Sequence, residues 1–203
     1  VFYNCVNLGM DVTGLFSDMP TLNYGVFTYA PVHGSLSLPS LQEIVRNVSR
    51  MQAFSYTKLR RIVSLGAIPS IPSGYNTNIP GVFAYIESLD YVRLPNTLTS
   101  IGDYAFYGCV VATDITLSNQ CKTIGEAAFY NCKALPELNI PDSVTSIGAY
   151  AFRSCGAITE LVFSDNVDTI GACAFYDCNG LKTVKLGKKI VELGDRLFYG
   201  CVN

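Results

Sequence analysis

The feature that most constrains the fold of this chain is a repeat of 23 residues that begins near Gly81 and continues to the C-terminus. From Ile101 onward each copy contains an Ile-Gly or Leu-Gly pair, a Phe that follows Ala or Leu, and a Cys three positions after the Phe. Self-similarity at such a period is typical of solenoids, in which each repeat forms one coil stacked on the preceding coil. The anchor residues are Phe83, Phe106, Phe129, Phe152, Phe175 and Phe198.

Looser copies of the same pattern extend the repeat toward the N-terminus. Their anchors are Phe2, Phe27 and Phe54, and the spacings from Phe2 up to Phe83 are 25, 27 and 29 residues. We therefore expect one domain over residues 1–203, with irregular coils and insertions over 1–77 and regular coils over 78–203. Because no polar cap follows the outermost anchors, we expect the segment to be a fragment of a longer protein, or its ends to be covered by end-to-end association.

Each regular coil divides into two halves with different periodicity. Ile101, Ala105, Phe106 and Cys109 lie at the spacing of one face of a short helical turn. The tripeptide 115–117 alternates apolar and polar residues like a half-buried strand. The pattern predicts an α/β solenoid, a right-handed coil with a parallel β-sheet on one face and short helical turns opposite. A lone coil buries too little apolar surface to offset its ordering, so the coils are stable only together.

Composition excludes several classes of function. Apolar residues make up 49% of the chain and charged residues 15%, which predicts a packed core. The net charge is −2, and basic residues adjoin only at Arg60-Arg61 and Lys188-Lys189, so we expect no nucleic-acid partner. No apolar run approaches the roughly 20 residues that cross a bilayer, so we expect no membrane insertion. The N-terminal residues 1–5 lack the regions of a signal peptide.

The single histidine, His33, limits catalytic chemistry. It falls at a position that the repeat assigns to the core, and no spacing gives it a triad or metal partner. No pair of carboxylates is marked out for acid–base work. We therefore expect no enzyme activity, no cofactor and no metal site.

The cysteines follow the repeat rather than a metal or disulfide motif. Cys109, Cys132, Cys155, Cys178 and Cys201 lie 23 residues apart, and no C-x-x-C pair is present. Small apolar packing is the favoured interpretation of such a slot, and a redox or metal ladder is the alternative.

The regular copies resemble a known family. Residues 124–135, followed by 138–148, closely resemble the BspA-like leucine-rich repeat, I-G-x-x-A-F-x-x-C-x-x-L-x-x-I-x-I-P-x-x-V. The resemblance is strong from Gly81 to Cys201 and partial from Phe2 to Leu65. It implies a protein of the bacterial or protist surface, extracellular or cell-surface location, and a role in adhesion. Departures from the motif are Thr57 and Ile86 in the Cys position, and His33 and Arg60 in the Leu position.

Outward positions of the predicted strands form the expected binding face. Two columns of side chains alternate with the buried positions. The residues that we expect to bind a partner there are Tyr91, Arg93, Asp114, Thr116, Glu137, Asn139, Glu160 and Lys185. The stacked carboxylates of Asp114, Glu137 and Glu160 are either a calcium site or, more simply, a hydrated acidic ridge.

Two joints and one aromatic row are further candidates. Residues 40–50 begin with a capping box and predict an amphipathic helix. Residues 66–80 predict an exposed loop, in which Tyr75 is a candidate binding residue. Each joint is either a binding element or only a lengthened connection. Tyrosines that follow the anchor Phe either bind sugars or proteins, or cover neighbouring coils, and Arg153 interrupts their row.

These features favour a non-enzymatic binding or adhesion module for a protein or glycan. The alternative is a structural or assembly element, either a spacer in a surface protein or a component of a virus particle.

Overall fold

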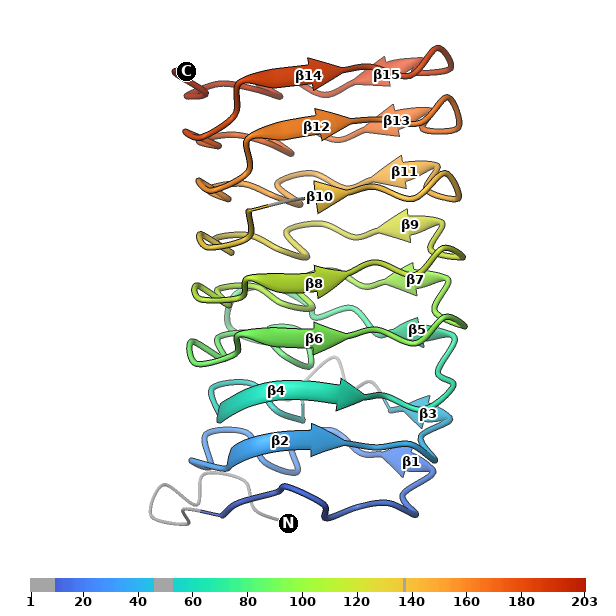
Figure 1. Ribbon diagram of the computed structural model, residues 1–203, viewed down its shortest axis with the longest axis vertical. Coiled ribbons are helices and arrows are strands. Elements are labelled where there is room, and N and C mark those ends of the chain that lie inside the picture. The colour runs from blue at the N-terminus through green and yellow to red at the C-terminus, as the bar shows by residue number, and fades with distance from the viewer. Residues whose placement is uncertain (1–9, 46–52, 137) are drawn as a thin grey trace.

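The chain forms a single stack of coils whose axis runs vertically in Figure 1. The computed structural model describes residues 10–45, 53–136 and 138–203. The chain climbs the stack from its N-terminal to its C-terminal coils, and most coils contribute one strand to each of two parallel sheets. The expected solenoid with a parallel β-sheet is confirmed, but it is a β-solenoid rather than an α/β solenoid.

The first sheet, which we call the front sheet, faces the viewer in Figure 1. Its strands pair in parallel in the orders β2-β4-β6-β8 and β10-β12-β14. Tyr91 lies opposite Asp114, and Glu160 lies opposite Thr183, so equivalent residues of successive coils form columns. The strands are β2 (His33–Ser37), β4 (Lys58–Ser64), β6 (Tyr91–Arg93), β8 (Asp114–Thr116), β10 (Leu138–Asn139), β12 (Glu160–Val162) and β14 (Thr183–Lys185).

The second sheet, which we call the side sheet, lies at the right and behind in Figure 1. Its strands pair in parallel in the orders β1-β3 and β5-β7-β9-β11-β13-β15. In most coils a hydrogen-bonded turn joins the front strand to the side strand, as when Leu98 donates to the carbonyl of Pro95. The strands are β1 (Thr21–Leu22), β3 (Glu43–Ile44), β5 (Ser70–Ile71), β7 (Ser100–Ile101), β9 (Thr123–Ile124), β11 (Ser146–Ile147), β13 (Thr169–Ile170) and β15 (Glu192–Leu193).

The short helical turns predicted opposite the sheet are not found: the described residues contain no helix. In the coil of Phe129, Ala127 and Asn131 have φ angles of 49° and 61°, which interrupt a right-handed helix on both sides of the ring. Alternate N–H groups instead donate to the next coil, as from Phe129 to the Ala151 carbonyl at 2.8 Å. The N–H groups between them close tight turns, such as Tyr130 to Ala127 at 3.1 Å.

The core is a column of anchor phenylalanines, as the repeat predicts. Successive rings from Phe27 to Phe198 stack with centroids 5.1–6.0 Å apart. Front strands alternate around this core: Val92 and Leu161 are buried, whereas their neighbours on the strand point outward. Stacking of identical side chains therefore gives one continuous interior through the coils.

The cysteines of the repeat pack into this interior. Cys109, Cys132, Cys155 and Cys178 are buried free thiols. Each donates its S–H to the carbonyl of the anchor Phe in the preceding coil, at sulfur–oxygen distances of 3.1–3.4 Å. Burial raises the pKa of the Cys109 thiol to about 12. The slot is thus filled by a small side chain that also satisfies a backbone acceptor, which supports the packing interpretation.

The first described coils depart from the regular cross-section, and two predicted core positions are wrong. His33 and Arg60 are exposed, and the residues before them, Val32 and Leu59, occupy the core. The pairing of β2 with β4 shifts register at Gly34/Ser35 and again at Leu36/Ser37. These irregularities change which side chains face inward, because a shift of one residue reverses the face that a side chain occupies.

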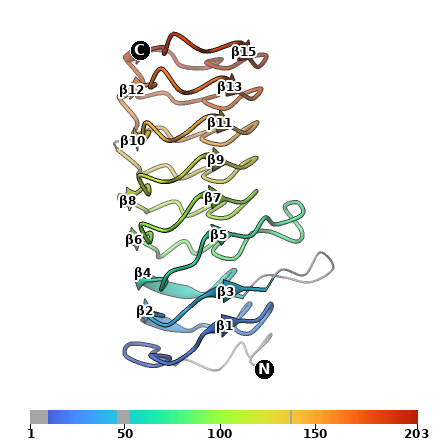
Figure 2. The same ribbon diagram turned by 90° about the vertical axis from the view of Figure 1, so that its right-hand side faces the viewer.

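The two joints differ from each other. The predicted helix over 40–50 is wrong in its described part, because Glu43 and Ile44 form β3 and pair with β1; residues 46–52 lie outside the described residues. Within 66–80, Ser70 and Ile71 form β5, and the rest of the segment projects away from the front sheet (Figure 2). Its tip is closed by a hydrogen bond from the N–H of Tyr75 to the Ile79 carbonyl at 2.7 Å.

Candidate ligand-binding face

The front sheet carries most of the predicted binding residues. Tyr91 and Arg93 lie on β6 and flank the buried Val92, so both point away from the core. Asp114 and Thr116 occupy the equivalent positions of β8 and are exposed. Farther along the stack the predicted residues Asn139, Glu160 and Lys185 are exposed on β10, β12 and β14.

Two predicted residues stand apart from this face. Glu137 lies outside the described residues. Tyr75 is 63% exposed on the segment that projects to the other side of the molecule (Figure 2). Asp114 and Glu160 lie on strands two coils apart, and among residues 10–45, 53–136 and 138–203 no group of three or more His, Cys, Asp or Glu is placed to hold a metal ion.

A shallow groove of about 500 Å³ lies across β4, β6 and the start of β8. Sequence reasoning missed several of its residues, although it noted the Arg60-Arg61 pair. Arg61 lies opposite Tyr91 in the sheet register, and Tyr91 lies opposite Asp114, so the three form one column across adjacent strands. The residues that line the groove are Gly34, Ser35, Arg60, Arg61, Asp90, Tyr91, Thr113 and Asp114.

The two arginines of the groove have different partners. Arg60 forms an ion pair with Asp90, with 2.6 Å between the guanidinium nitrogen and the carboxylate oxygen. Its side chain is 71% exposed, so this pair contributes little stability. Arg61 instead lies over the ring of Tyr91, 4.6 Å from the ring centroid. The aromatic ring orients this guanidinium while leaving its hydrogen-bond donors without an ionic partner among the described residues.

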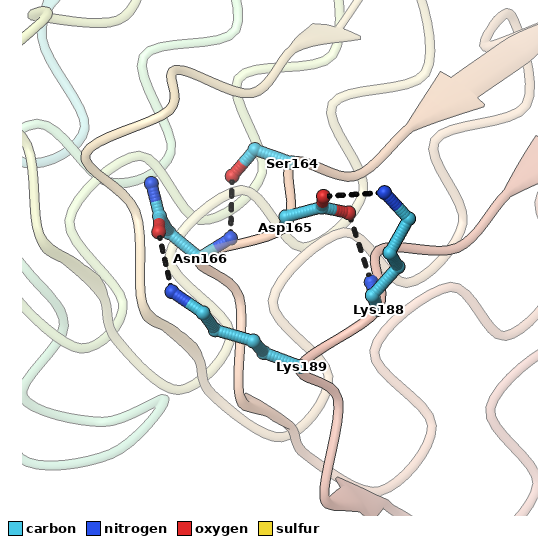
Figure 3. A network of polar contacts seen from close by, with 5 residues as sticks. All are labelled: Ser164, Asp165, Asn166, Lys188 and Lys189. Carbon is cyan, nitrogen blue, oxygen red and sulfur yellow. Dashed lines mark hydrogen bonds and ion pairs between the residues drawn. The ribbon is translucent and has the colours of Figure 1, made fainter.

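The lysine pair 188–189 shows the opposite arrangement (Figure 3). Lys188 donates its backbone N–H and its ammonium group to Asp165, at 3.0 and 3.2 Å. Lys189 donates to the side-chain oxygen of Asn166 at 3.2 Å. The N–H and ammonium groups of Lys188 lower the pKa of the Asp165 carboxyl. Of the two basic pairs in the sequence, the lysines are thus engaged within the protein, whereas Arg61 makes no ion pair among the residues described.

A second candidate surface is a row of aromatic side chains on the turns that carry the anchor phenylalanines. Most neighbouring rings in this row stack at centroid distances of 4.6–4.9 Å, for example 4.6 Å between Tyr107 and Tyr130. Tyr85 and Tyr107 are instead tilted by 56° at 5.1 Å. Where the rings stack, each ring face is covered by its neighbour, so that part of the row presents ring edges rather than faces to a ligand. Burial raises the pKa of Tyr107 to about 12, as does, to a smaller extent, the proximity of Tyr85.

The row also contains tyrosines that the repeat pattern did not place in it. Tyr29, Tyr56 and Tyr85 follow the anchor Phe by two positions instead of one, yet they stack in the same row. A Cβ on Gly108, the equivalent position in the next coil, would lie 2.9 Å from the ring of Tyr85. The glycine thus leaves space for the ring of Tyr85. The next ring of the row is that of Tyr107, which contacts Tyr85. This geometry favours coil-to-coil stabilisation over sugar stacking.

Arg153 continues this row between two tyrosines. Its guanidinium lies 4.2 Å from the ring centroid of Tyr176 and 5.6 Å from that of Tyr130. Its Nε is buried without a hydrogen-bond partner. The cation therefore maintains the stack but leaves one donor unsatisfied.

Comparisons with known proteins place this geometry in a family. A model of the BspA-type leucine-rich repeat region matches residues 77–203 with six copies. The structure is similar to that of a leucine-rich repeat protein from T. pallidum, with 22% identity, a TM-score of 0.56, and coverage of 93% of this chain and 85% of that one. It is also similar to a leucine-rich cell surface protein from Faecalibacterium prausnitzii A2-165, with 18% identity, a TM-score of 0.56, and coverage of 91% and 61%. None of the curated proteins matches the chain. Because the family model spans more than half of its length, the protein belongs to the BspA-type leucine-rich-repeat family.

Proposed function

We propose that this protein is a non-enzymatic, surface-exposed binding module that recognises a protein or glycan partner through its front sheet. The observation that carries the proposal is the groove across β4, β6 and β8. There an arginine that has no ionic partner among the described residues, a tyrosine and a carboxylate lie in one column. Rigid sheets that present such side chains in fixed register bind partners without a large ordering cost.

One further finding supports this proposal. A structural neighbour is named a leucine-rich cell surface protein, which is consistent with a location outside the cell or at its surface. The described residues contain no helix long and apolar enough to span a membrane.

His33, the single histidine, is exposed at the edge of the front sheet, where its backbone pairs with that of Asp11. Asp11 accepts hydrogen bonds from Thr13, which is a turn-capping role.

The test is binding of the purified chain to an array of immobilised oligosaccharides and to purified mucin and collagen. We expect binding to at least one of these probes. The double variant Arg61→Ala/Tyr91→Ala should lose it, while the exposed cation Lys122, which lies outside the front sheet, can be changed to Ala without effect. Binding that survives substitutions across the front sheet, or absence of binding to every probe, would contradict the proposal.

A further inference from the structure

The groove on β4, β6 and β8 restricts the chemistry of its ligand. We infer that it binds a glycan that bears carboxylate groups, an inference that rests on the proposed binding function and names the ligand class. Four observations support this inference. They are the cations in and beside the groove, the orientation of the Arg61 guanidinium, the hydrogen-bond acceptors of Asp114, and the polar lining of the groove.

The charged residues of the groove leave one cation for an anionic ligand. The groove is lined by Arg60, Arg61, Asp90 and Asp114, so its lining carries no net charge. Arg60 is paired with Asp90, which leaves Arg61. Two further exposed cations, Lys58 and Arg93, lie on β4 and β6 and add positive charge beside the groove.

Arg61 is the group suited to receive the ligand's carboxylate. Asp90 is already bound to Arg60, and the ring of Tyr91 holds the Arg61 guanidinium in place. A guanidinium donates two parallel hydrogen bonds to a carboxylate, and prior orientation lowers the entropy lost on binding. The groove thus contains a pre-oriented anion receptor.

Asp114 excludes ligands that offer only acceptors. As an ionised carboxylate it can only accept hydrogen bonds, so its partner must carry donors. Asp114 follows Arg61 and Tyr91 in the same column, two strands from Arg61 and therefore about 10 Å away. A sugar chain supplies hydroxyl donors for Asp114 at one end and a carboxylate for Arg61 at the other. A chain that carries a sulfate, a phosphate or a carboxylate on every unit would face Asp114 with like charge, so neutral sugars separate the carboxylates of the ligand.

The lining of the groove favours a glycan over an acidic peptide. Protein partners are usually anchored by aromatic or aliphatic side chains in desolvated pockets. None of the residues that line this groove is aliphatic, and the groove is wide and shallow. Short polar groups at its ends, Ser35 and Thr113, suit the hydroxyl groups of sugars.

The test measures binding of the intact chain to oligogalacturonate, to its neutral methyl ester, to sialyllactose and lactose, to dextran sulfate and to polyglutamate. We expect at least one acidic glycan to bind about tenfold or more tightly than its neutral counterpart, with an affinity that falls as salt is added. Arg61→Gln should abolish this preference, and Arg61→Lys should restore only part of it because a lysine lacks the planar fork. Asp114→Asn should weaken the glycan and strengthen dextran sulfate.

Matched controls keep the outcomes separate. Lys122→Gln removes an exposed cation outside the front sheet and should leave binding unchanged, and the Tm of each variant reports whether it folds. Equal or tighter binding of dextran sulfate or polyglutamate would overturn the inference in favour of a general polyanion or an acidic peptide. No preference for an acidic glycan, together with binding of a neutral glycan or protein that front-sheet substitutions abolish, would overturn the inference and leave the proposed function standing.

Discussion

The coils built on β2 and β4 differ from those built on β6 to β14 in the length and pairing of their front strands. Strands β2 and β4 have five and seven residues and a bulged register, whereas the later front strands have two or three residues in regular pairing. Longer strands expose more side chains per coil, and the groove lies where the two regions meet. The regular coils thus supply a repetitive scaffold, and the irregular coils supply chemical variety on one face.

The side sheet shows the same contrast. After each side strand the regular coils place a glycine, such as Gly125 or Gly148, whereas the irregular coils place Asn23, Val45 or Pro72. A Cβ at Gly148 would lie 2.6 Å from the backbone nitrogen of Glu126 in the preceding coil. At this position of the side sheet the regular coils thus approach each other closely through glycine, which permits their uniform spacing.

The largest expected effect comes from interrupting the phenylalanine column in the regular region. Phe129→Ala removes a buried ring that stacks on two neighbours, so the free energy of unfolding should fall by about 3–5 kcal/mol. Phe198→Ala is the internal control, because that ring is only partly buried and its one described stacking partner is Phe175. Urea denaturation measures both. Equal losses would show that the column does not act through neighbour contacts.

The glycines that follow the side strands of the regular coils predict a smaller loss of stability when they are replaced. Gly148→Ala should lower the free energy of unfolding by about 1–3 kcal/mol, because the preceding backbone must shift. Gly156→Ala places its methyl group in open space, and its effect should stay within about 0.5 kcal/mol. Thermal denaturation of the two variants compares them directly. A neutral Gly148→Ala would show that the close approach is not required.

Alkaline pH should act on the regular coils, because their slot carries thiols where the irregular coils carry Thr57 and Ile86. Burial raises the folded-state pKa of Cys109 to about 12 from the ordinary thiol value of 9.0. The unfolded thiol loses its proton first, so the stabilisation present below pH 9 is lost as the pH rises toward 12.

The variant Cys109→Ala tests whether the buried thiol causes this loss of stability at alkaline pH. Between pH 9 and 10 the wild type should lose about 1 kcal/mol more than the variant, measured by urea denaturation under reducing conditions. Cys201→Ala, at a thiol that is only partly buried, should change the pH dependence less. Parallel pH profiles for wild type and Cys109→Ala would contradict the assignment.

The smallest effect concerns the aromatic row, which is all tyrosine in the irregular coils and is interrupted by Arg153 in the regular ones. Arg153→Tyr removes a buried, unpartnered Nε and completes the stack. The free energy of unfolding should rise by about 0.5–1.5 kcal/mol. Arg153→Ala, which removes the contact without replacing it, should lower stability instead. A loss of stability in both variants would show that the cation itself is required.

Part of the site could be predicted from the sequence, because strand alternation is a local property. The repeat placed Tyr91, Arg93, Asp114 and Thr116 on the outward face, where the structure finds them. It did not place Arg61 beside Tyr91, because these residues are 30 positions apart and meet only through the pairing of β4 with β6. The isolated basic pair Arg60-Arg61 was the available signal.

The sequence by itself determined the solenoid, the phenylalanine column and the cysteine slot, because a fixed period places identical side chains in one stacked interior. The tertiary structure alone decided the turn geometry. Hydrogen bonds to the next coil, such as that from Phe129 to Ala151, compete with the local bonds of a helix and prevail. It also decided that His33 faces outward, and it brought Arg61, Tyr91 and Asp114 together, because both depend on how one coil registers against the next.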